Sequence, residues 1–100
     1  MKLVDIAKVI RSKNAGPLQV TIDLMFADKA GFDRASQSHA LSPENLATLY
    51  NCPQDDLVVI PFAPAHAIKI VIARPVVAGS PGDRDVYGAQ QHGPLLELEL

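Results

Sequence analysis

The side chains best suited to chemistry lie between Gly79 and Pro94, a stretch that holds four of the six glycines. Asp85 and His92 could form an acid/base pair, with Tyr87 as a hydrogen-bond donor. We therefore take Asp85 and His92 as the catalytic candidates. The other residues of this loop that could contact a ligand or a partner are Ser80, Gly82, Asp83, Tyr87, Gln90 and Gln91. Loops of this length are usually functional or disordered, yet an ordinary surface connection is the alternative.

A second polar cluster consists of Arg11-Ser12-Lys13-Asn14 followed by Gly16. Its two cations can supply charge-assisted hydrogen bonds to a carboxylate or a phosphate, and a glycine lets the backbone approach a ligand closely. The cluster lacks the glycine and lysine spacing of a Walker loop. We expect these five residues to form an anion-binding turn, with a solvated basic turn as the alternative.

Neither stretch predicts a metal or a cofactor. Asp83 and Asp85 could bind a hard cation, but the further acidic ligands of an EF-hand loop are missing. Cys52 is the single cysteine and has no neighbouring base to activate it, so we interpret it as a packed small side chain. We interpret His66 as a partly buried side chain and not as a ligand, because this is the more frequent role of a histidine among alternating isoleucines.

The composition limits the classes of protein to which the chain can belong. A length of 100 residues allows one domain, residues 1–100. Nine basic and eleven acidic residues give a net charge of −2, which argues against a nucleic-acid-binding surface. No apolar run is long enough to span a membrane, and Asp5 and Lys8 interrupt the apolar core that a signal peptide needs. We expect a cytoplasmic protein that binds neither nucleic acid nor membranes.

The strands that must position these residues are predicted by their apolar patterns. Residues 18–26 alternate strictly, which predicts one buried and one wetter face. Residues 3–10 fit both a helix and a strand, and their β-branched side chains favour a strand. The run Leu57–Ile60 predicts a strand buried on both faces, which Pro61 should end. Two further strands are expected at 66–74, with His66 on the isoleucine side, and at 95–100, with Leu96, Leu98 and Leu100 inward.

Two helices are expected between the second strand and the run at 57–60. Asp28 can cap a helix over residues 29–39. The sequence Ser42-Pro43-Glu44 is a stronger start signal, and Asn51 can end that second helix in the left-handed conformation. The side chains expected to face inward are Phe32 and Ala35 in the first helix and Leu46, Leu49 and Tyr50 in the second.

This order of elements predicts a ferredoxin-like α+β sandwich, in which a mainly antiparallel sheet of four to five strands carries helices on one face. A third helix, over residues 86–91, has a weak pattern. Half of one sheet face would then be thinly covered, and uncovered apolar sheet normally finds a partner. We therefore expect an oligomer or a hetero-complex.

A resemblance to a known family rests on three stretches: Lys2–Ala7, Arg11–Pro17, and Gly79–Asp83 with Asp85–His92. In these stretches the chain resembles a small family known only as a domain of unknown function, DUF family 4387. The resemblance runs nearly end to end. Members accompany proteins similar to the AtuA-like (acyclic terpene utilisation) family, whose own C-terminal ferredoxin-fold domain carries an Arg-Ser-Gly-Asp-Lys-Gly signature. Arg11 and Ser12 match that signature, whereas the two residues after them depart from it. The resemblance implies the fold and an AtuA-like partner, and it supplies no catalytic residues.

Taken together, these features predict a small accessory subunit that docks on an AtuA-like protein. The subunit would complete a site for a small organic acid or an acyl thioester, as part of a two-component lyase, hydratase or isomerase. One alternative is a stand-alone homo-oligomeric lyase or isomerase with Asp85 or His92 as base. Another is a module that binds a small anionic ligand. Activity of the isolated chain would decide against the accessory subunit.

Overall fold

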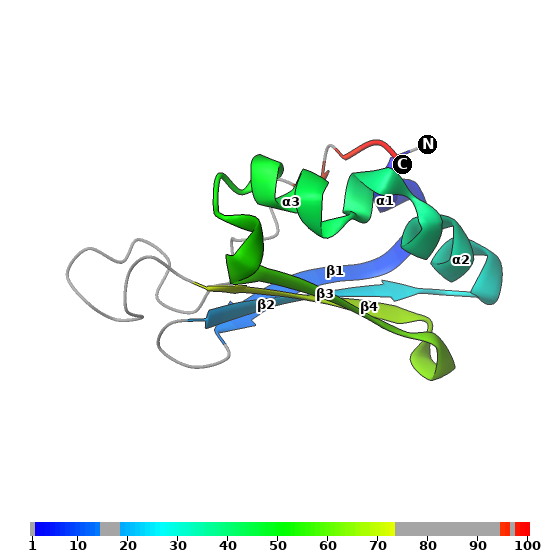
Figure 1. Ribbon diagram of the computed structural model, residues 1–100. Helices are drawn as coiled ribbons and strands as arrows, with labels where there is room; N and C mark the ends of the chain where they lie inside the picture. The colour runs from blue at the N-terminus through cyan, green and yellow to red at the C-terminus, as the bar shows by residue number, and fades with distance from the viewer. Residues whose placement is uncertain (1, 15–18, 74–94, 97) are drawn as a thin grey trace.

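An antiparallel sheet of four strands lies at the centre of this computed structural model, which describes residues 2–14, 19–73, 95, 96 and 98–100 (Figure 1). The strands are β1 (Ala7–Asn14), β2 (Gln19–Phe26), β3 (Leu57–Phe62) and β4 (Ala67–Ala73). Their spatial order is β1-β2-β4-β3, and each neighbouring pair is antiparallel. The helices are α1 (Leu3–Ile6), α2 (Lys29–Gln37) and α3 (Pro43–Leu49), with short 3₁₀ turns η1 (His39–Leu41), η2 (Gln54–Asp56) and η3 (Ala63–Ala65).

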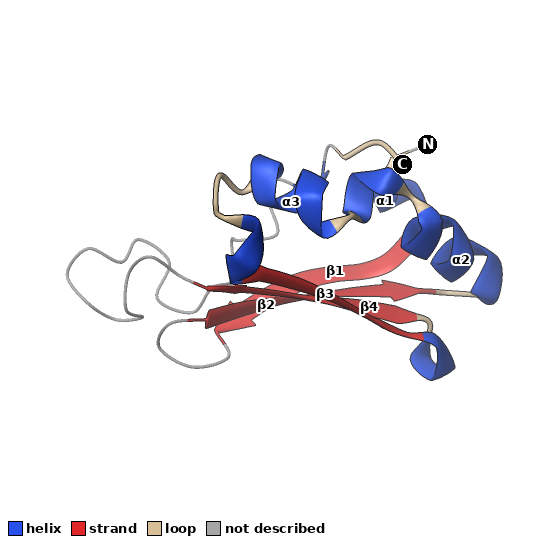
Figure 2. Ribbon diagram, in the orientation of Figure 1, coloured by secondary structure: helices blue, strands red, loops and turns tan. Residues whose placement is uncertain are grey.

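Figure 2 shows that α1, α2 and α3 all lie on the same side of the sheet. The chain leaves β2, crosses this side through α2 and α3, and returns in β3, while β4 pairs between β2 and β3. This is the split β-α-β unit of the ferredoxin-like arrangement. The outer place beside β2 is taken by β1, which precedes β2 in the chain. The predicted α+β sandwich with helices on one face is therefore confirmed.

The second strand shows how sequence pattern becomes a face. Val20, Ile22, Leu24 and Phe26 are buried beneath the helices, as the alternation in residues 18–26 predicts. The neighbouring β4 continues this buried layer with Ile68, Ile70 and Ile72. Phe32 of α2 meets Phe26 edge to face, with ring centroids 6.4 Å apart. The core is thus a single layer between sheet and helices.

Both predicted helix starts are confirmed by their caps. The Oδ1 atom of Asp28 accepts a hydrogen bond from the amide of Gly31 at 2.9 Å, and α2 ends at Gln37, two residues earlier than expected. The Oγ atom of Ser42 accepts from the amide of Asn45 at 3.2 Å. Such caps satisfy amide groups that the first helical turn leaves without partners.

The inward face of the helices also follows the prediction, with one exception. Phe32, Ala35 and Leu46 are buried, and Asn51 has the left-handed conformation expected after α3, with φ 54°. Leu49, however, is exposed and does not share the buried face of α3.

The N-terminal segment differs from its prediction. Residues 3–6 form α1, and the strand begins only at Ala7. Tertiary contacts decide this choice, because Leu3 is fully buried and its amide donates to the carbonyl oxygen of Leu98 at 2.9 Å. A side-chain bond from the Lys2 amide to Asp5 Oδ2, at 3.1 Å, closes the helical turn.

The prediction for Leu57–Ile60 is wrong in burial, because β3 is an edge strand and only one of its faces is covered. Pro61 also does not end the strand, which continues to Phe62. A proline is tolerated at the edge of a sheet when its missing N–H would point away from the neighbouring strand. The proline is therefore a sign of the edge and not of a strand end.

Two further predictions are corrected. His66 lies outside the strand in a left-handed turn, with φ 49°, and its ring lies 6.2 Å from that of Phe32. Leu95 and Leu96 form a helical turn in which Leu95 is buried and Leu96 is exposed. Among the described residues of the predicted C-terminal strand, the ladder is reduced to one isolated bridge, from Glu99 to Lys2. The predicted helix at 86–91 lies outside the described residues.

Candidate functional site

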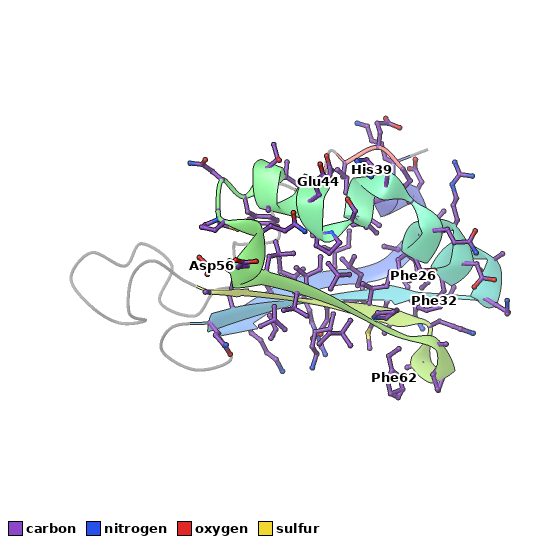
Figure 3. All side chains as sticks on the ribbon, in the orientation of Figure 1. Phe26, Phe32, His39, Glu44, Asp56 and Phe62 are labelled. Carbon is purple, nitrogen blue, oxygen red and sulfur yellow. The ribbon has the colours of Figure 1, made fainter. Side chains whose placement is uncertain are left out.

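The side of the sheet opposite the helices carries a surface that we call the open face. Strand alternation places the other half of the sheet residues here, in three cross-strand rows. The rows are Lys13–Thr21–Val71–Val58, Arg11–Asp23–Lys69–Ile60 and Val9–Met25–Ala67–Phe62. Figure 3 shows the labelled Phe62 on this side, away from Phe26 and Phe32. None of the three helices covers the open face (Figure 2).

The β3 end of each row is a large apolar side chain in contact with water. Val58 is 51%, Ile60 46% and Phe62 54% exposed. The described residues include three other exposed large apolar side chains, Val4, Leu49 and Leu96, which lie on separate segments. Single exposed apolar residues are normal, whereas a continuous strip on a flat sheet marks an interaction surface.

The β1 end of the open face is cationic. The Arg11 Nε atom lies 3.6 Å from Asp23 Oδ2, with the arginine side chain 59% exposed and the aspartate 17%. Lys69 lies directly opposite Asp23 on β4, and Lys13 lies one row away on β1. Neither lysine has an ion-pair partner among the described residues. The three described rows of the open face therefore carry three cations and one carboxylate.

Thr21 occupies the middle of the first row and behaves differently from its neighbours. It is 7% exposed, and its Oγ1 atom is buried without a hydrogen-bond partner among the described residues. A buried hydroxyl without a partner costs about 1–3 kcal/mol. The centre of this row is thus closed to water, while its two ends, at Lys13 and Val58, are exposed.

The predicted anion-binding turn at residues 11–14 is corrected by the structure, because these residues belong to β1. Alternation separates Arg11 and Lys13, on the open face, from Ser12, which is buried opposite Ile22 on the helix side. Asn14 is the last residue of β1 and pairs with Val20 of β2. The cluster reads as a turn because it is polar, but an edge strand tolerates lysine and arginine on its solvent side.

The remaining predicted site residues lie outside the part of the chain that the structure describes. They are Gly16, Ser80, Gly82, Asp83, Asp85, Tyr87, Gln90, Gln91 and His92. The acid/base pair and the ligand contacts assigned to them stay predictions.

The apolar strip and Lys69 were missed by the sequence analysis. A run such as Leu57–Ile60 looks buried on both faces when it is read alone. The signal that could have corrected it is Pro61, since proline inside a sheet is confined to edges.

Two hollows lie beside the helix layer in the described residues. One of about 570 Å³ contains Cys52, and one of about 460 Å³ contains His39 and Ser42. Burial, with a smaller contribution from Asp56, raises the pKa of the Cys52 thiol, which opposes a nucleophilic role as the sequence suggests. Ser42 Oγ is occupied by its cap to Asn45. These hollows therefore offer less functional chemistry than the open face.

Two kinds of feature are absent from the described residues. They contain no group of three or more histidine, cysteine or acidic side chains placed to hold a metal ion. Their helices are all too short or too polar to cross a membrane.

Comparison with known proteins gives one match. The model of a family described as a domain of unknown function (DUF4387) matches residues 3–99. No curated protein and no solved structure matches the chain. The resemblance at the level of this family is thus confirmed over nearly the whole chain.

Proposed function

The chain belongs to the family described as a domain of unknown function (DUF4387), and we propose that it acts as a small accessory subunit that docks on a larger protein through its open face. The observation that carries this proposal is the strip of Val58, Ile60 and Phe62, about half exposed on a sheet face that none of the described helices covers. Apolar surface of this kind is stabilised when a partner removes it from water, at about 25 cal/mol per Å².

We propose an AtuA-like protein as the larger partner, because the family resemblance implies that association. Docking would complete a site for a small organic acid or an acyl thioester, since ligand sites commonly form where two proteins or domains meet. The predicted loop residues Asp85 and His92 would contribute to that site as catalytic groups. In this arrangement the isolated chain has no activity of its own.

The proposal is tested by mixing the chain with a purified AtuA-like protein and measuring the mass of the complex by light scattering after gel filtration. The double variant Ile60→Thr/Phe62→Thr removes two members of the apolar strip and places threonine, a β-branched residue suited to a strand, at both positions. It should weaken association at least tenfold. Leu49→Gln is the control, because Leu49 is also a large exposed apolar side chain but lies on α3. Equal binding by the wild type and the double variant would contradict the proposal.

A second candidate function, binding of a small anion, is favoured by the placement of Arg11 and Lys13 next to one another on the same face of β1. Calorimetric titration of the isolated chain with inorganic phosphate or acetate tests it. Saturable binding that Lys13→Gln removes would favour this module over the accessory subunit.

A further inference from the structure

From the charges on the open face we infer what kind of partner it fits: a different protein whose surface places carboxylates over Arg11, Lys13 and Lys69 and apolar side chains over β3. This inference rests on the proposed function and specifies the partner's chemistry. It argues against a second copy of the same chain as the occupant. The argument depends on the distribution of charge, on symmetry and on area.

The middle row shows why the partner must be acidic. Asp23 lies between Arg11 and Lys69 in register, and one carboxylate cannot neutralise both cations. The Asp23 Oδ2 atom lies 3.6 Å from the Arg11 Nε atom. Directly opposed residues on neighbouring strands hold their Cβ atoms about 5 Å apart, so Lys69 is close to the same aspartate. Covering this row with an apolar surface would bury cations without partners, which is strongly unfavourable.

The β3 end of the three rows is suited to an apolar partner surface. All three β3 positions on the open face are apolar, and Val71 and Ala67 continue this character onto β4. The face therefore has an apolar edge along β3 and cations on β1, and Lys69 on β4 lies directly beside that edge, opposite Ile60. A partner that matches it carries acidic groups and apolar groups in separate zones, and such complementarity also fixes orientation.

Symmetry argues against a second copy as the partner. Two copies that stack by this face are related by a twofold axis lying between them, so the same patch meets itself. If the axis runs along the strands, β2 of one copy covers β4 of the other and Asp23 can meet Lys69, but β1 covers β3, so Arg11 and Lys13 meet the apolar strip. If the axis runs across the strands, β1 covers β1 and cations meet cations. In either arrangement the three rows of the two copies together hold six cations and two carboxylates, so most of the cations stay without a carboxylate.

The area of the face indicates how strongly charge must contribute. Four strands about 4.8 Å apart and six residues of about 3.4 Å each give a flat area of roughly 400 Å². Stable complexes bury about 800 Å² per partner. The apolar strip of Val58, Ile60 and Phe62 alone is then too small for a stable complex. Attraction between the cations and partner carboxylates should therefore be a large part of the association, and it should weaken with salt.

The test is a titration of the chain with a purified AtuA-like protein at 50 and 500 mM NaCl. Lys69→Glu should weaken binding at least tenfold at low salt, and the loss should shrink at high salt. Arg34→Glu makes the same charge change on the exposed surface of α2, on the helix side, and should change binding less than twofold. Carbodiimide cross-linking should join Lys69 or Lys13 to an aspartate or glutamate of the partner.

The outcomes separate this inference from the proposed function. If the Ile60→Thr/Phe62→Thr variant loses binding while Lys69→Glu binds as wild type, the open face is a docking surface and the acidic partner is wrong. If the chain forms a dimer that the Ile60→Thr/Phe62→Thr variant converts to a monomer, the occupant is a second copy and the inference is overturned. If none of these variants alters binding of the partner, both statements fail.

Discussion

Two isoleucines on neighbouring strands give a direct measure of the two faces. Ile70 is fully buried on β4, and Ile60 on β3 is 46% exposed. They belong to adjacent register positions, Val59↔Ile70 and Ile60↔Lys69, so their side chains point to opposite sides of the sheet. The same substitution to alanine should therefore have very different costs.

The magnitudes follow from burial. Truncating a buried isoleucine to alanine costs about 2–5 kcal/mol, and we expect the upper part of this range at Ile70, in the centre of the core layer. Full burial of such a side chain contributes about 1.5–3 kcal/mol. Ile60 is only about half buried, so Ile60→Ala should cost about 1 kcal/mol. In a domain of this size, that corresponds to a Tm lower by about 4–8 °C for Ile60→Ala and by a severalfold larger amount for Ile70→Ala.

The assay is urea unfolding of the isolated chain, followed by far-UV circular dichroism, at two protein concentrations. If the free energy of unfolding falls with urea concentration at the same slope in both variants as in the wild type, the variants unfold from the same folded state. Equal costs at the two positions, or a larger cost at Ile60, would refute the assignment of faces. A cost at Ile60 that rises with protein concentration would mean that the open face is covered by self-association.

Three further predictions concern single sites. Thr21→Val removes the buried hydroxyl that has no hydrogen-bond partner among the described residues, and it should raise the free energy of unfolding by about 1 kcal/mol. Thr48→Val is the control and should not raise it, because the Thr48 hydroxyl donates to the carbonyl oxygen of Glu44. A Thr21→Val protein less stable than the wild type would contradict the absence of a partner for this hydroxyl. Asp28→Ala removes the α2 cap and should cost about 1 kcal/mol in urea unfolding, and an unchanged midpoint would show that the cap is not formed in solution. Because the pKa of the Cys52 thiol is raised, less thiolate exists at any given pH, and iodoacetamide should react with Cys52 more slowly than with a free thiol. Asp56→Asn should shift the pH profile of this reaction to lower pH, because it removes a charge that raises the pKa. An unchanged profile would rule out the charge effect.

The parts of the fold that sequence predicts well are those with local physical causes. The alternation in β2 fixes a buried face, and the caps at Asp28 and Ser42 fix helix starts within the chain segment itself. These signals need no knowledge of what packs nearby.

The errors occur where long-range contacts decide. Residues 3–6 become helical because Leu3 is buried against the core and bonds to Leu98, far away in sequence. The run at β3 looks doubly buried, but its exposure depends on its place at the sheet edge. The cluster at 11–14 looks like a turn, but pairing with β2 makes it a strand and divides its side chains between two faces. Position in the sheet is a property of the whole topology.

The central claim is that the open face docks on a partner. Hydroxyl-radical footprinting, read by mass spectrometry with and without a purified AtuA-like protein, tests it most directly because it reports side-chain exposure residue by residue. We predict that Phe62 and Met25 on the open face become protected in the complex, while Leu49 on α3 keeps its reactivity. Protection of Leu49 with unchanged Phe62 and Met25 would contradict the claim and move the interface to the helix side.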